Sequence, residues 1–313
     1  MVCISPIVLL LTALLAVEFA GNECAQCYSH EGQDLQKLAT PLQQTVHALR
    51  RIHTDCYDTG LPAKAKPLLA KLKNELEDLV SVALADSGAA HLSASDLQFH
   101  INAKLKADGV LTYRSADVVV DENYADTGYD YGEVFEITVT QPPEHPDLLA
   151  VTTTVGVCCG EDTSFYLYRR HGYRWSLALA YTAGYYDEIS GAHGQVQFGI
   201  SPADKGGKLF IVVANVNPWC TSNWQSLRYA VLRESRLAHR PHVLLEKTHS
   251  IFLNGDPSYS LVVGRDSFSF GFLDEKFMEL LNKGVDIDLN DKRAKRLLKY
   301  RVSGLNVVKV IDR

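Results

Sequence analysis

The spacing of apolar residues in this sequence changes near Val110. Before that point apolar side chains recur every three or four residues, which is the period of an amphipathic helix. After it they alternate with small or polar residues, as in Phe268, Phe270 and Phe272, which is the period of a strand with one buried face. The sequence therefore predicts an α+β chain, with its helices first.

The predicted strands follow one another closely, with turn-forming segments such as His171-Gly172 and Lys205-Gly206-Gly207 between them. They are expected near 133–140, 151–157, 164–169, 175–179, 195–200, 208–215, 225–233, 242–248, 258–264, 267–272, 297–303 and 305–311, with a short helix at 275–282. The spacing leaves no room for crossover helices, so the large β region should be antiparallel. A sandwich, an open barrel and a partial propeller all fit this pattern.

Three helices are expected before the strands. Thr40 and Pro41 favour a helix that is capped at Thr40 and runs to about Thr54. A leucine stripe from Leu68 to Val80 predicts a second helix, and the pair suggests a helical hairpin. Ser93 is the expected N-cap of a third helix over 94–107. With 46% hydrophobic residues in 313, the chain has enough apolar side chains for a substantial core.

An apolar run over residues 4–17 resembles the hydrophobic region of a signal peptide and is short for a membrane span. We therefore expect a signal peptide or N-terminal membrane segment at 1–23, a helical region at 24–109 and an antiparallel β-rich domain at 110–313. The expected location is secreted or extracytoplasmic. The alternative is a protein that an uncleaved N-terminal segment anchors to the membrane.

Cysteine content agrees with export. Six cysteines remain once the N-terminal segment is set aside, and an even number is typical of disulfide-bonded proteins from oxidising compartments. The disulfide candidates are Cys24, Cys27, Cys56, Cys158, Cys159 and Cys220. A redox or zinc role for the first two is less favoured, because no strand precedes them and no recognised set of further ligands follows.

The sequence contains few residue patterns that are typical of catalytic or metal-binding sites. The chain has no Gly-x-Ser-x-Gly, His-Glu-x-x-His or phosphate-binding glycine loop, so no reaction is assigned. No cofactor is predicted, although an acidic segment offers oxygen ligands for Ca²⁺ at Asp121, Asn123, Asp126, Asp130 and Glu133. Two further groups deserve a structural test: an acid–base set of Asp187, Glu188 and His193, and a metal-binding set of His239, His242 and His249.

Charge and aromatic content bear on partners. A formal net charge of −6 disfavours nucleic acid. Tyrosines in turns, such as Tyr181, Tyr185 and Tyr186, are typical of surfaces that bind glycans or peptides, although tryptophans such as Trp219 and Trp224 are also common in cores. The expected function is a non-catalytic binding or structural module with a protein or glycan partner at the cell envelope. The alternative is a hydrolase that uses carboxylates and histidine from loops 121–133 and 185–193 in one cleft.

Overall fold

The computed structural model describes residues 38–55, 60–86, 88–111, 129–158, 160–217, 224–252, 259–287 and 294–310. The apolar run of residues 4–17 lies outside these ranges. Among the helices in the described ranges, none has both the length and the apolar composition needed to cross a bilayer.

The N-terminal helices largely match those predicted from the sequence. Residues 38–49 are helical, followed by α2 (Ala65–Ala85), the short 3₁₀ turn η1 (Ala89–His91) and α3 (Ala94–Ala107). Ser93 and Asp96 form the capping box at the start of α3, as predicted.

The boundaries expected for the first helix are wrong at both ends. Residues 38–40 are already helical, so Thr40 is not the N-cap. Pro41 lies within the described part of this helix. The helix ends at residue 49 rather than 54, since the Thr54 backbone N–H leaves the helical path and donates to Asp130 Oδ2 at 2.8 Å.

The strands form three antiparallel sheets within the described residues. The first sheet contains β1 (Tyr131–Val134), β2 (Thr138–Thr140), β3 (Leu148–Val157), β4 (Gly160–His171) and β5 (Arg174–Tyr181). The second contains β6 (Val196–Ile200), β7 (Ile211–Val216), β8 (Trp224–Arg233) and β9 (His242–Phe252). The third contains β10 (Tyr259–Val263), β11 (Ser267–Leu273), β12 (Lys295–Ser303) and β13 (Asn306–Val310), with α4 (Glu275–Asn282) between β11 and β12.

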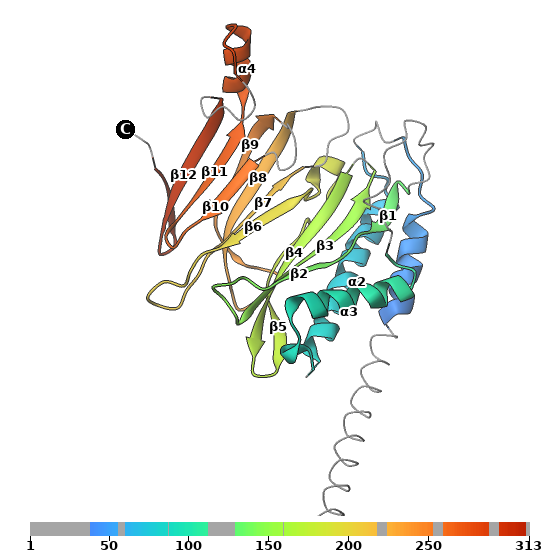
Figure 1. Ribbon diagram of the computed structural model, residues 1–313. Helices are drawn as coiled ribbons and strands as arrows, with labels where there is room; N and C mark the ends of the chain where they lie inside the picture. Colours follow the sequence, from blue (N-terminus) through green and yellow to red (C-terminus); the bar gives the residue numbers. More distant parts are fainter. Residues whose placement is uncertain are drawn as a thin grey trace, which may run out of the picture.

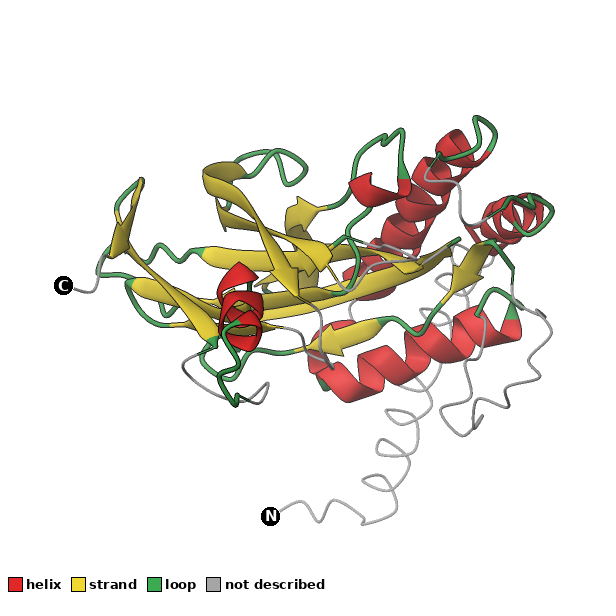
Figure 2. Cartoon of the chain, turned by 90° about the horizontal axis from the view of Figure 1, so that it is seen from above, coloured by secondary structure: helices red, strands yellow, loops and turns green. Residues whose placement is uncertain are grey.

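The sheets stack face to face in chain order. One face of the first sheet packs on the helices, and its other face packs on the second sheet through residues such as Phe165 and Val213. The second sheet then packs on the third through Tyr229 and Phe270. Figure 1 shows this order from the helices to β10–β12, and Figure 2 shows the longer helices together on one side of the strands. The predicted α+β class with N-terminal helices and a large antiparallel β region is confirmed, and the open strand order excludes a closed barrel.

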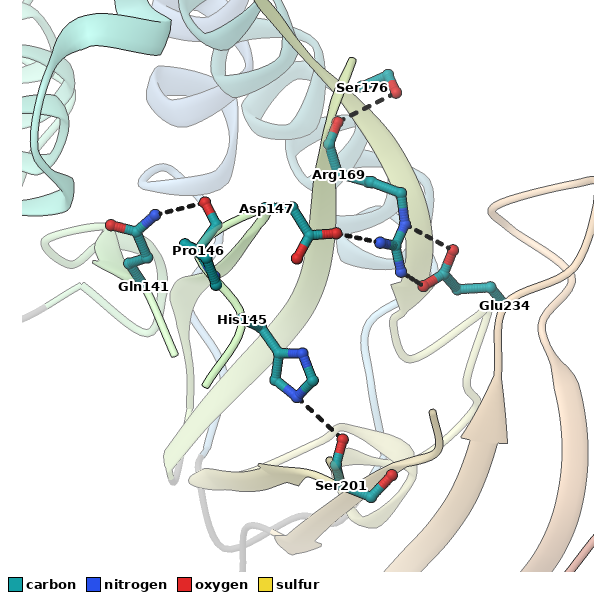
Figure 3. Close-up of polar contacts among 8 residues, drawn as sticks. All are labelled: Gln141, His145, Pro146, Asp147, Arg169, Ser176, Ser201 and Glu234. Atoms are coloured by element: carbon teal, nitrogen blue, oxygen red, sulfur yellow. Dashed lines mark hydrogen bonds and ion pairs between the residues drawn. The ribbon is translucent and has the colours of Figure 1, made fainter. Parts of the chain in front are cut away.

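Polar contacts join the first two sheets at one end of their interface (Figure 3). Arg169 on β4 binds two carboxylates: its Nη1 contacts Asp147, and its Nη2 lies 2.6 Å from Glu234 Oε1 in the loop after β8. His145 Nε2 lies 3.0 Å from the Ser201 carbonyl oxygen. These contacts fix the connection before β3 and the loops around the second sheet.

Candidate functional site

Asp162 is the centre of the best-formed polar site in the described residues. Asp162 lies on β4 with 0% exposure, on the face that packs against α2. The Lys73 ammonium of α2, itself 5% exposed, donates to Asp162 Oδ2 at 2.7 Å and to the Ala183 carbonyl at 2.7 Å. A buried charge requires such partners because desolvation otherwise costs several kcal/mol, on the order of 5 or more.

The loop between β5 and β6 completes this site. Where β5 stops at Tyr181, the chain returns along the free edge of β4, and the Thr163 N–H donates to the His193 carbonyl at 2.6 Å. The His193 backbone N–H then donates to Asp162 Oδ1 at 3.0 Å, and the Tyr186 hydroxyl donates to Asp162 Oδ2 at 3.1 Å. We name Lys73, Asp162, Tyr186 and His193 the Asp162 cluster.

Burial dominates the electrostatics of the cluster. Loss of hydration raises the pKa of Tyr186, and the neighbouring Asp162 carboxylate raises it further. Loss of hydration also lowers the pKa of His193 to about 4, against the smaller opposing effect of Asp162. The imidazole is therefore neutral at physiological pH. Its ring stacks on Tyr181 with 4.4 Å between centroids.

A polar stripe on α2 extends the site along β4. Lys73, Glu77 and Ser81 are spaced four residues apart, so they lie on one face of the helix. The Ser81 and Tyr168 hydroxyls are 2.9 Å apart. Burial raises the pKa of Glu77, and His239 Nε2 in the loop before β9 lies 3.0 Å from its Oε1.

The arrangement is suited to positioning rather than to proton transfer. Both Asp162 oxygens accept hydrogen bonds from within the protein, and the residue is shielded from solvent. A general base needs a lone pair within reach of a substrate proton. The cluster instead fixes residues 183–193 against α2 and β4.

The predicted acid–base set is dispersed. Asp187 pairs with Lys66 at 2.6 Å, and its carbonyl accepts from the Leu61 N–H. Glu188 pairs in a β-bridge with Gly60 and accepts from the Ser190 hydroxyl at 3.3 Å. His193 instead meets Asp162, so the structure does not bring these three side chains into one group.

Three of the calcium candidates, Asp121, Asn123 and Asp126, lie outside the described residues. Asp130 accepts the Thr54 N–H and lies 3.7 Å from His53 Nδ1. Glu133 lies against Gly156. Calcium binding by this segment therefore stays a prediction.

The remaining histidines are also separated. His239 contacts α2, whereas His249 lies 3.2 Å from the Tyr229 hydroxyl, in the interface between the second and third sheets. Within the described ranges, no group of three or more His, Cys, Asp or Glu side chains is placed to hold a metal ion.

Cys158 Sγ lies 3.3 Å from Thr54 Oγ1. The other disulfide candidates, Cys24, Cys27, Cys56, Cys159 and Cys220, lie outside the described residues, so the full pairing stays a prediction.

The aromatic candidates divide between core and surface. Tyr131 is fully buried, and Trp224 packs on Phe252. Tyr185 is 68% exposed in the loop that the Asp162 cluster holds. Trp219 and Tyr124 lie outside the described residues.

Sequence reasoning missed Lys73 and Asp162, which form the buried ion pair of the Asp162 cluster. The available signal was Lys73 itself, which lies within the leucine stripe beside Leu72 and Leu76. A charge in that position must either reach solvent or find a buried partner. Comparison of the chain with protein-family models, with curated proteins and with solved structures finds no match in any of the three.

Proposed function

We propose that this chain is an exported, disulfide-bonded protein whose β-rich region is a non-catalytic binding module at the cell envelope or outside the cell. The observation that carries the proposal is that both oxygens of Asp162, a fully buried carboxylate beside loop 182–195, accept hydrogen bonds from the protein and so hold that loop. A rigidly held loop with an exposed tyrosine suits recognition, because little conformational freedom is lost on binding.

The alternative, a hydrolase built from loop carboxylates, receives less support. The two loops both approach the segment before α2, where Thr54 binds Asp130 and Leu61 contacts Asp187. Asp130 and Asp187 are thus engaged in local contacts. We expect Cys158 to be disulfide-bonded, which agrees with export, since such bonds persist mainly in oxidising compartments.

Export is tested by the intact mass of the protein from fractions of its native host, with and without reduction and thiol labelling. We expect a mature chain that lacks about the first 20 to 25 residues and has thiols that react only after reduction. A full-length cytoplasmic chain with reactive thiols would contradict export.

Binding is tested by sedimenting the labelled mature protein with envelope preparations of the same host. Tyr185→Ala should weaken binding about tenfold or more, as expected for an aromatic anchor. Tyr173→Ala is the matched control, since Tyr173 is 69% exposed but lies in the β4–β5 turn. Equal effects of the two substitutions would contradict a role for the loop, and cleavage of an envelope component would contradict a non-catalytic function.

A further inference from the structure

The interface between the first and second sheets ends in polar residues on one side. Along β7, Val213 packs in this interface, and Asn215 follows two residues later on the same face. Along β8, Ala230 packs there, and Arg228 lies two residues earlier on that face. Asn215 and Arg228 are directly paired in the antiparallel register, so they are neighbours at the end of an apolar interface.

Residues from the first sheet and its loop lie beside this pair. Tyr181 ends β5 and packs on the same apolar core, with the His193 ring stacked against it at 4.4 Å between centroids and 14° between planes. His193 precedes β6, whose first residue Val196 pairs with Asn215. Burial raises the pKa of Tyr181 and lowers the pKa of His193, and Arg228 is close enough to both to lower each pKa by a smaller amount.

Three buried polar atoms here have no hydrogen-bond partner among the described residues: Tyr181 Oη, His193 Nδ1 and Asn215 Oδ1. Asn215 is 0% exposed and His193 is 5% exposed. The Asn215 amide already donates to Asn217 Oδ1 at 3.2 Å, which leaves its own oxygen as an acceptor without a donor. Buried polar groups are nearly always paired, so three unpaired atoms in one place indicate a missing partner.

Arg228 supplies the charge. The Arg228 guanidinium is half-buried, and it forms no ion pair or hydrogen bond with the described residues. Arg169, at the other end of the same interface, binds both Asp147 and Glu234 (Figure 3). The contrast between the two arginines indicates that the partner of Arg228 lies outside the described residues.

We propose that Tyr181, His193, Asn215 and Arg228, the Arg228 cluster, form a binding site for a hydroxylated carboxylate of the uronic acid class. This inference rests on the proposed binding function and assigns it a ligand class. A carboxylate matches a single guanidinium and the tyrosine hydroxyl. Adjacent hydroxyl groups supply the donors that Asn215 Oδ1 and His193 Nδ1 lack.

A phosphate dianion fits this cluster less well. Its single hydroxyl can donate to only one of the two acceptors, and one arginine leaves part of its charge unmatched. Glu246 on β9 pairs with Ala230 and is close enough to raise the pKa of Tyr181, so it would repel a second negative charge.

The test uses the purified mature protein with D-glucuronate as the probe, D-glucose as the neutral control and inorganic phosphate as the competing anion, measured by calorimetric titration. Glucuronate should bind at least about tenfold more tightly than glucose or phosphate, since a charge-assisted hydrogen bond contributes a factor of that size. Arg228→Gln should weaken glucuronate binding about tenfold, whereas Arg174→Gln at the exposed β4–β5 turn should not change it.

Tyr181→Phe separates a ligand role from a structural one. Because the Tyr181 hydroxyl has no partner within the described chain, its removal should leave the urea midpoint of unfolding unchanged or higher. The same change should weaken glucuronate binding about threefold or more, while Tyr173→Phe leaves binding unchanged. Glu246→Gln should tighten glucuronate binding about twofold. If Arg228→Gln does not fold, Tyr181→Phe and Glu246→Gln together test the proposed site.

Glucuronate binding that is no tighter than glucose binding, or that neither Tyr181→Phe nor Glu246→Gln alters, would overturn this site. Envelope binding that survives both substitutions would keep the proposed function and reject the Arg228 cluster as its ligand site. Glucuronate binding by a chain that remains cytoplasmic with free thiols would keep the site and reject export.

Discussion

Lys73 illustrates how strongly a buried charge depends on its partner. Removal of one member of a buried ion pair leaves the other desolvated, at a cost of about 3–5 kcal/mol. Lys73→Met should therefore lower the free energy of unfolding, measured by urea titration, by about 3 kcal/mol, because the hydrogen bonds from Tyr186 and His193 still support Asp162.

The control for Lys73 is Lys71→Met. Lys71, whose side chain is 54% exposed, pairs with Glu75 (15% exposed) at 3.5 Å on the same helix, and an i,i+4 pair with one solvent-exposed partner contributes about 0.5 kcal/mol. A loss below about 1 kcal/mol for Lys73→Met would contradict the importance assigned to the Asp162 cluster.

His193 makes stability depend on pH in a defined direction. Its pKa in the folded state is about 4, below the unfolded value near 6.5, so the unfolded chain binds the proton first as pH falls. The stability due to the neutral imidazole is fully present above pH ~6.5 and is lost toward pH ~4, with about 2 kcal/mol lost between pH 7 and 5.

Urea titrations at pH 7 and pH 5 measure this loss. His193→Gln should reduce the decrease by about 2 kcal/mol, and His91→Gln, at an exposed position in η1, should leave it unchanged. A wild-type decrease that His193→Gln does not reduce would show that other groups control acid sensitivity.

At the scale of elements, β1 packs unusually closely on the first helix. Gly132 has φ +83°, and a Cβ there would lie 2.8 Å from Leu49 Cβ and 3.0 Å from the Val46 carbonyl. Gly132→Ala therefore combines left-handed backbone strain with a collision and should lower the free energy of unfolding by about 3 kcal/mol or more.

Gly172→Ala isolates the backbone part of that cost. Gly172 has φ +63° in the β4–β5 turn, and nothing lies within 4 Å of an added Cβ. Gly172→Ala should lower the free energy of unfolding by only about 1–2 kcal/mol in the same urea titration. Equal losses for the two variants would mean that the helix moves away from β1 at little cost.

Elements were predictable where local chemistry decides them. The Ser93 capping box marks the start of α3, and the Phe268 to Phe272 alternation marks β11. Prediction from local sequence was wrong where contacts with residues distant in the sequence determine the structure. The strand expected over 133–140 is interrupted because the Asn102 side chain hydrogen-bonds both the N–H and the carbonyl of Ile137. The Lys73–Asp162 pair was likewise hidden, since 89 residues separate its members.

At the scale of the whole molecule, periodicity predicts that a strand has a buried face but not which sheet covers it. The second sheet is covered on both faces, by the first sheet and by the third. β7 is accordingly buried along almost its whole length, whereas β13 is an edge strand with exposed side chains. Since amide exchange follows the free energy of local opening, β7 should be the most protected strand and β13 among the least.

Hydrogen exchange monitored by mass spectrometry also tests whether the stack unfolds as one unit. Phe270, with 0% exposure, lies on β11 in the interface with the second sheet, so Phe270→Ala should cost about 3–5 kcal/mol. If the sheets open together, the amides of β7 and those of β3 in the first sheet should both lose protection by this amount. Unchanged protection of β3 would instead show that the third sheet opens separately, leaving the helices and the first sheet folded.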